Sequence, residues 1–194
     1  MTSLTGSSAL IERLWPSRSA NGLWRSALLI GFGSVFLAVL AQVKVPMWPV
    51  PITLQTFAVL LVGITYGFRL GTATILFYMA QGAIGLPVFA GGIGGLAVLM
   101  GPTGGYLAGF ILAVMATGAL ADRGWSQGVV KAVAALVIGN ALIYAAGVSY
   151  LHAAFVPDLH KAVMLGVAPF LIGDALKIAL AVAVLQLSWK RSEK

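Results

Sequence analysis

The main pattern along the chain is a series of long apolar stretches without charged residues, separated by short segments that carry the ionisable side chains. Such stretches cover 26–43, 45–68, 70–121 and 132–151. A membrane-spanning helix needs roughly 20 predominantly apolar residues, and each stretch is long enough for one. The pattern therefore predicts an integral membrane protein built from helices.

Two regions decide how many helices there are. The stretch 70–121 is too long for one helix, and its middle, 86–103, is rich in proline and glycine, so we divide it there. The last apolar region, 162–189, is interrupted by Asp174 and Lys177. Neither half would span alone, so we expect one helix carrying both residues and starting near Pro169. The expected fold is an all-α bundle of six transmembrane helices, at 25–43, 53–68, 70–86, 102–121, 128–151 and 163–189.

The composition agrees with a membrane protein and leaves room for one domain. Of the 194 residues, 60% are hydrophobic and 9% charged, whereas soluble domains average about 25% charged residues. We expect a membrane domain at 25–189 between an N-terminal segment, 1–24, and a short tail, 190–194. The first segment has no apolar core that would mark a signal peptide. No cysteine is present, which excludes disulfides and thiolate chemistry.

The positive charges predict the orientation of the bundle. With six spans and a cytoplasmic N-terminus, only Lys44 and Lys161 fall on the outer side, and Lys177 lies within a helix. The remaining lysines and arginines fall on the inner side: Arg13, Arg18, Arg25, Arg69, Arg123, Lys131, Lys190, Arg191 and Lys194. This asymmetry predicts that both termini lie in the cytoplasm. The protein is then expected to be a multi-pass protein of the cell membrane. It also accounts for the net charge of +7 without nucleic-acid binding.

The loops indicate that ligand binding takes place on the outer side. The outer connections are longer than the inner ones and rich in proline and glycine. Irregular backbone at membrane depth is tolerated only where protein or a water-filled cavity satisfies its polar groups. We therefore expect 45–52 and 86–103 to fold as long outer loops over a binding site.

Asp174 and Lys177 are the strongest candidates for function. Each costs roughly 2.5 to 3.5 kcal/mol at the centre of a membrane helix, and at this spacing they share one helix face. They could form a pair that only orders the bundle. The alternative, which we favour, is a ligand site in the outer half of the membrane, because intramembrane charges usually mark a substrate or ion path.

The glycines support packing and ligand contact rather than nucleotide binding. No GxxxxGK[ST] sequence is present. Gly101, Gly105 and Gly109 recur every four residues, which favours close helix approach, whereas Gly91 and Gly92 read as loop backbone that can approach a ligand.

Other polar residues carry weaker signals. Asn140 and Tyr144 share a helix face and could bond a neighbouring helix. His152 and His160 have no carboxylate cluster nearby, so we expect no metal site. The absence of a credible Ser, His and Asp arrangement argues against an enzyme, and we expect no catalytic residue and no cofactor.

Three segments together resemble the BioY family, the biotin-specific S component of energy-coupling factor (ECF) transporters. They are VPITLQTFAVLLVG at 50–63, GLPVFAGGIGGLAVLMGPTGGYLAGF at 85–110 and GVAPFLIGDALKIALA at 166–181. The resemblance implies a six-helix subunit that binds biotin from outside and works with a transmembrane coupling protein and two cytoplasmic ABC-type ATPases. Biotin is then a transported ligand and not a prosthetic group.

The resemblance, together with the chemistry of biotin, suggests site residues. The expected substrate-binding residues are Gln55, Phe89, Gly91, Gly92, Tyr106, Asp174 and Lys177. The expected contacts with the coupling protein are Ala27, Gly31, Ser34 and Ala38 on the first helix. Two alternatives stay open: a stand-alone secondary carrier for biotin or a similar small vitamin, in which Asp174 titrates, and a structural membrane subunit without a ligand.

Overall fold

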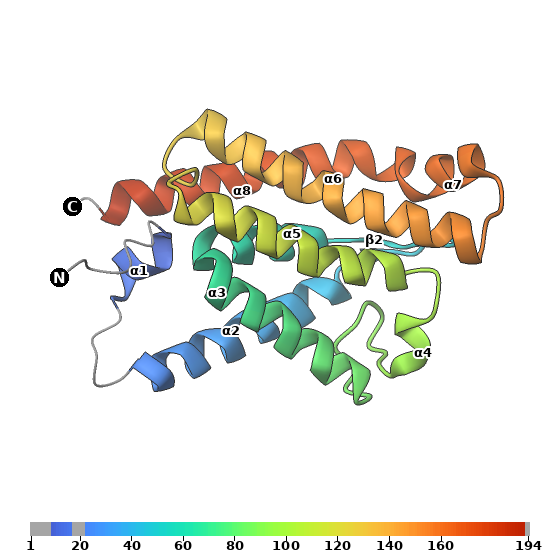
Figure 1. The fold of residues 1–194 in the computed structure, drawn as a ribbon, viewed down its shortest axis with the longest axis horizontal. Coiled ribbons are helices and arrows are strands. Elements are labelled where there is room, and N and C mark those ends of the chain that lie inside the picture. Colours follow the sequence, from blue (N-terminus) through green and yellow to red (C-terminus); the bar gives the residue numbers. More distant parts are fainter. Residues whose placement is uncertain (1–8, 17–21, 193–194) are drawn as a thin grey trace.

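A computed structural model of the protein describes residues 9–16 and 22–192, and most of them are helical. Its elements in chain order are α1 (Leu10–Leu14), α2 (Gly22–Gln42), β1 (Lys44–Val45), β2 (Ile52–Thr53), α3 (Gln55–Ala83), α4 (Leu96–Leu99), α5 (Gly104–Asp122), α6 (Val129–Ala154), α7 (Leu159–Gly166), the 3-10 turn η1 (Ala168–Phe170) and α8 (Leu171–Ser192). α5, α6 and α8 run roughly along the long axis of the bundle, and α2 and the second half of α3 are inclined to them (Figure 1). Arg18 and Lys194 lie outside the described residues.

The helix α3 contains two of the predicted spans. Among the described residues, five helical stretches are long and apolar enough to cross a membrane, and α3 is counted once among them. Its chain reverses direction halfway (Figure 1). The Gln55 side chain donates to the Tyr78 hydroxyl over 2.7 Å, whereas a straight helix would separate these residues by roughly 35 Å. The described chain therefore passes through the bundle six times, as predicted.

Gly67 makes the reversal within α3 possible. Its φ of 77° lies in the left-handed region that favours glycine. The backbone N–H of Phe68, at the start of the second half, donates to the Asp122 carboxylate over 3.1 Å. A side chain on Gly118 of α5 would lie 2.7 Å from the Gly67 carbonyl carbon, so small residues on both sides let the turn pack closely against α5.

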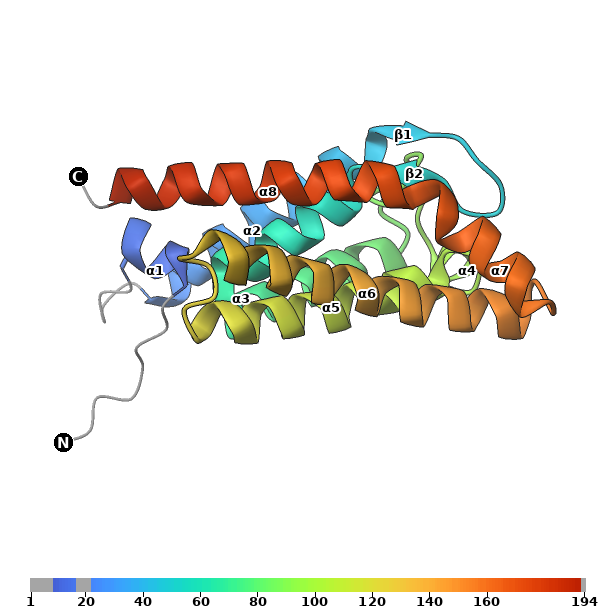
Figure 2. The same cartoon turned by 90° about the horizontal axis from the view of Figure 1, so that it is seen from above.

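The two ends of the bundle differ in character. α1 and the C-terminal end of α8 lie together at one end, while the β-hairpin, α4 and α7 lie at the other (Figures 1 and 2). α1 is held there by the Arg25 guanidinium, which donates to Glu12 over 3.0 Å, and by Arg13 stacked 5.0 Å above the Trp189 ring. Both described ends of the chain thus lie on one side, which agrees with the predicted topology.

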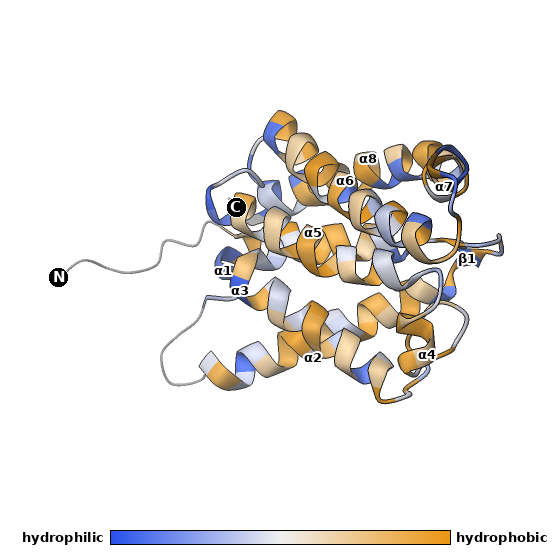
Figure 3. Ribbon diagram, turned by 45° about the vertical axis from the view of Figure 1, so that its right-hand side comes forward, coloured by the Kyte–Doolittle hydropathy of each residue, from blue (hydrophilic) through white to orange (hydrophobic). Residues whose placement is uncertain are grey.

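The exposed surface of the helices is apolar. Hydrophobic residues dominate the helical bodies (Figure 3), and Leu23, Phe32, Val130 and Ile172 are 91%, 70%, 82% and 80% exposed. In water such large apolar patches would be unfavourable, but hydrocarbon tails cover them at no cost. The protein is a multi-pass membrane protein.

Small residues bring α5 and α6 together. A side chain on Gly105 would lie 2.8 Å from the Ala146 carbonyl oxygen, and one on Gly109 would lie 2.9 Å from the Ile143 Cα. The packing role predicted for these two glycines is confirmed. For Gly101 it is wrong, because the only atoms near its missing side chain belong to the preceding turn, α4.

The prediction of one helix over 163–189 is also wrong at its start. A separate helix, α7, begins with the Asp158 carboxylate accepting the Lys161 backbone N–H over 3.0 Å. Val167, with φ −128° and ψ −55°, ends it, and Pro169 lies in the first turn of η1 before α8 begins. The proline marked the beginning of the spanning helix, as expected. The other five predicted helices are confirmed within a few residues, whereas α1, α4 and the β-hairpin were not predicted.

Candidate functional site

A cavity of about 170 Å³ lies in the outer half of the bundle. Both outer segments line it, through Val50 and Pro51 from the first and Phe89, Ala90 and Ile93 from the second. The predicted position of these segments over a site is therefore confirmed. The helices complete the wall with residues of α3, α4, α5, α6, η1 and α8. Most of the lining is apolar, with a few converging polar groups, which is the usual composition of a small-molecule site.

The polar groups converge at the end of the cavity nearest α8, and we call Thr56, Tyr144, Asp174 and Lys177 the polar cluster. Asp174 and Lys177 are only 3% and 7% exposed. The Lys177 ammonium donates to the Asp174 carboxylate over 2.6 Å and to the Thr56 hydroxyl over 3.0 Å. The Tyr144 hydroxyl donates to the other carboxylate oxygen over 2.5 Å.

The sequence explains why the polar cluster forms at this depth. Asp174 and Lys177 are three residues apart on α8, so both side chains leave the same face of the helix. From Leu171 they lie about one and two turns inward. Thr56 is in the first turn of α3, whose first half is short, so this polar helix start also lies below the outer surface. Three helices therefore bring the partners that two buried charges require.

A chain of hydrogen bonds positions the second outer segment. The Gln55 amide donates to the Tyr78 hydroxyl, which in turn donates to the Val88 carbonyl over 2.8 Å. The next residue, Phe89, stacks edge-on against Tyr78 with ring centroids 5.6 Å apart. Its ring fills the space that a side chain on Gly82 would need. Phe89 is consequently 1% exposed and forms a fixed part of the cavity wall.

The structure brings together most of the residues expected to bind the substrate. Gln55, Phe89, Tyr106, Asp174 and Lys177 all line the cavity. The Tyr106 hydroxyl already donates to the Gly166 carbonyl over 2.9 Å, which leaves it less free for a ligand. Gly91 and Gly92 are exposed and do not belong to the lining. Their φ values of 91° and 68° show that glycine serves the turn itself.

Sequence reasoning missed several lining residues. Thr56 and Phe170 were not singled out, although each is next to a motif that was: Thr56 follows Gln55, and Phe170 follows Pro169. Tyr144 was expected to bond a neighbouring helix, and it does so through Asp174 of α8. Asn140, one turn away on α6, is 7% exposed, and its side-chain oxygen has no partner among the described residues.

The residues expected to contact a partner helix lie on one face of α2, but they differ in exposure. Ala27 is exposed, and Gly31 and Ala38 are half-buried. Ser34 is 1% exposed, and its hydroxyl donates to the Gln81 side chain of α3. Because Ser34 faces its own bundle, the structure corrects the expectation for that residue.

Comparison with known proteins gives a consistent result. The BioY family model matches residues 12–194. The chain is 40% identical over 169 residues to a protein of Thermotoga maritima named biotin transporter BioY. The aligned region covers 87% of this chain and 98% of that protein. It is 43% identical over 144 residues to a probable biotin transporter BioY of Pyrococcus horikoshii, covering 74% and 83%.

A solved structure shares the fold. It is described as the S-component for biotin from an ECF-type ABC transporter, and it superimposes with a TM-score of 0.79 over 90% of this chain and 95% of that chain. At 24% sequence identity, this likeness concerns the fold alone.

Proposed function

The chain belongs to the BioY family, and on that premise we propose that it captures biotin from the outer side of the membrane for uptake. The observation that carries the proposal is the polar cluster at one end of an otherwise apolar cavity. A ligand that fits must be largely apolar and must present hydrogen-bonding groups at one end.

Biotin has these properties. Its fused ring carries two ureido N–H groups, a carbonyl and a thioether, and a hydrocarbon tail ends in a carboxylate. The Asp174 carboxylate accepts the ureido N–H groups, because bonds to an ionised acceptor are stronger than neutral ones. Lys177 has three donor hydrogens and uses two within the polar cluster. The third is available for the ureido carbonyl, while Phe89 and Phe170 cover the ring.

Energy for uptake comes from separate proteins in this proposal. The sequence has no GxxxxGK[ST] motif, so a transmembrane coupling protein and two cytoplasmic ABC-type ATPases supply the ATP hydrolysis. Ala27, Gly31 and Ala38 of α2 contribute to the surface that meets the coupling protein. The protein lies in a bacterial or archaeal cell membrane, with 1–24 and 190–194 on the cytoplasmic side.

Titration calorimetry with the purified protein tests ligand capture. We expect saturable binding of biotin and no binding of riboflavin, a vitamin with a larger fused ring system. Absence of biotin binding by a folded sample would overturn the proposal. Uptake of radiolabelled biotin by cells with and without the coupling protein and ATPases then separates an energised subunit from a stand-alone carrier, which would transport equally well in both.

A further inference from the structure

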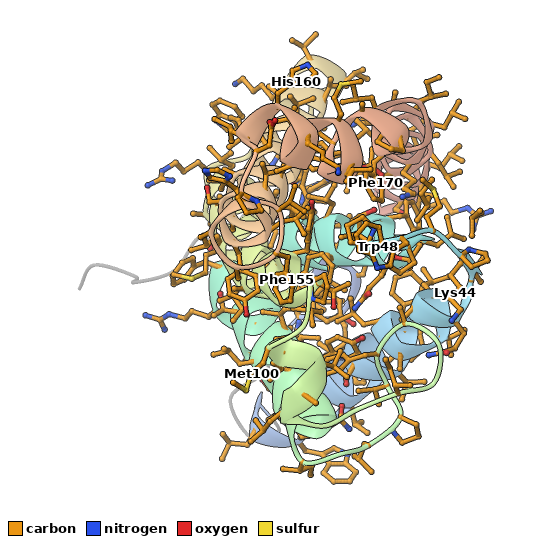
Figure 4. All side chains as sticks on the ribbon, turned by 90° about the vertical axis from the view of Figure 1, so that its right-hand side faces the viewer. Lys44, Trp48, Met100, Phe155, His160 and Phe170 are labelled. Atoms are coloured by element: carbon orange, nitrogen blue, oxygen red, sulfur yellow. The ribbon has the colours of Figure 1, made fainter. Side chains whose placement is uncertain are left out.

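Lys44 lies at the outer rim of the cavity. It is the first residue of β1 and pairs with Thr53 of β2. Residues directly opposite each other in an antiparallel pair project to the same face of the ribbon. Thr53 lines the cavity, so the Lys44 side chain leaves the hairpin on the cavity side. Figure 4, which looks onto the outer end, shows Lys44 at the margin of this end, with Trp48 and Phe170 nearer its middle.

The Lys44 ammonium lies against the second outer segment. The ammonium occupies the space that a side chain on Gly91 would fill. Two residues before Gly91, the Phe89 carbonyl accepts from the Gln42 amide over 3.2 Å, which ties the end of α2 to this segment. Phe89 and Ala90 line the cavity. The ammonium therefore lies where the two outer segments meet. It is next to Gly91, and the residue before Gly91, Ala90, belongs to the cavity wall.

Lys44 is a cation without an anionic partner in the described structure. The ion pairs within residues 9–16 and 22–192 are Arg25 with Glu12 and Lys177 with Asp174. Lys44 is exposed, so its charge stays hydrated and can receive an anion at little desolvation cost. Lys177, in contrast, is already paired.

We propose that Lys44 is a specificity-determining residue that receives the ligand's tail carboxylate at the outer rim. This inference rests on the proposed function. A carboxylate placed inside the polar cluster would lie beside Asp174, and two like charges in a buried site repel each other. The ureido ring therefore occupies the polar cluster, the tail runs outward along the apolar wall, and the carboxylate reaches Lys44.

The test uses two ligands and two variants. Biotin and biotinamide share ring and tail, but only biotin carries the negative charge. We expect Lys44→Gln to weaken biotin binding by about fivefold, the upper range for an exposed ion pair, and to leave biotinamide binding unchanged. Lys161→Gln removes the other outer lysine, which lies on α7, and should affect neither ligand. Lys44→Arg should bind biotin nearly as well as the unmodified protein.

The outcomes separate this inference from the proposed function. If the unmodified protein binds no biotin, the proposed function fails. If it binds biotin but Lys44→Gln weakens both ligands equally, or neither, the role of Lys44 is overturned. If only Lys177→Gln weakened the binding of biotin more than that of biotinamide, the carboxylate would lie in the polar cluster. That result would also overturn the role of Lys44.

Discussion

The exchange Asp174→Asn tests whether the buried carboxylate binds the ligand or only pairs with Lys177. The substitution preserves shape but removes the charge that receives the Lys177 ammonium and the Tyr144 hydroxyl. Lys177, 7% exposed, then keeps neutral acceptors, the Thr56 hydroxyl and the asparagine oxygen, but loses its anionic partner. Removing one member of a buried ion pair costs about 3 to 5 kcal/mol because the other charge stays uncompensated. We expect a loss of that size in the free energy of unfolding.

Ligand binding should fall as well, for a separate reason. A hydrogen bond to a charged group contributes about 1.5 to 3 kcal/mol, so losing a charged acceptor for the ureido N–H groups should weaken biotin binding at least tenfold. The single variant alone cannot separate this effect from misfolding.

The double variant Asp174→Asn with Lys177→Met separates the two. It removes both charges, so most of the lost stability should return. If Asp174 accepts hydrogen bonds from biotin, binding remains at least tenfold weaker although the protein is stable. Thermal unfolding in detergent gives the stability, and titration calorimetry gives the affinity.

The decisive result is the affinity of the double variant. Binding equal to that of the unmodified protein would show that the pair only orders the bundle, and the reasoning would be refuted. Asp158→Asn is the matched control, because Asp158 is an exposed carboxylate on the outer side and asparagine also caps a helix well. It should change neither measurement.

Three further predictions concern the surroundings of the site. Tyr78→Phe breaks the bond from Gln55 and should speed hydrogen exchange in 86–93 and weaken biotin binding; unchanged exchange there would contradict the role assigned to this hydroxyl. Gly105→Ala should lower the melting temperature by roughly 2 to 10 °C through overpacking against α6, whereas Gly31→Ala, with no atom within 4 Å, should not. A backbone N–H in the first turn of α7 lowers the pKa of Asp158. Its capping contribution is therefore full above the ordinary carboxyl pKa and lost as pH falls through the lowered one, so the stability difference between the unmodified protein and Asp158→Ala should shrink on acidification.

The number and direction of the helices could be predicted because they depend on local quantities. Hydropathy over about 20 residues decides whether a segment can span, and the lysine and arginine positions decide the orientation. The separate helix α7 was missed because it is apolar enough to extend the hydropathy signal of α8. Only the cap at Asp158 and the backbone at Val167 separate the two helices.

The candidate site could be predicted only in part. Asp174 and Lys177 stand out because charge is rare and costly in a membrane helix. Thr56 and Tyr144 do not, because a hydroxyl on a spanning helix is common and its partner lies more than 20 residues away in the chain.

By itself, the sequence determined that this chain crosses a membrane several times and that one helix carries a charged pair. Both follow from the cost of placing a residue in hydrocarbon, which depends on the residue and its near neighbours. Tertiary structure alone decided the rest. The reversal at Gly67 brings Gln55 to Tyr78, and the packing of α3, α6 and α8 gives the pair its hydroxyl partners. The turn at Gly91 leaves room for the Lys44 ammonium beside the cavity. Such contacts join residues far apart in the chain, so they depend on how the helices pack and not on any local pattern.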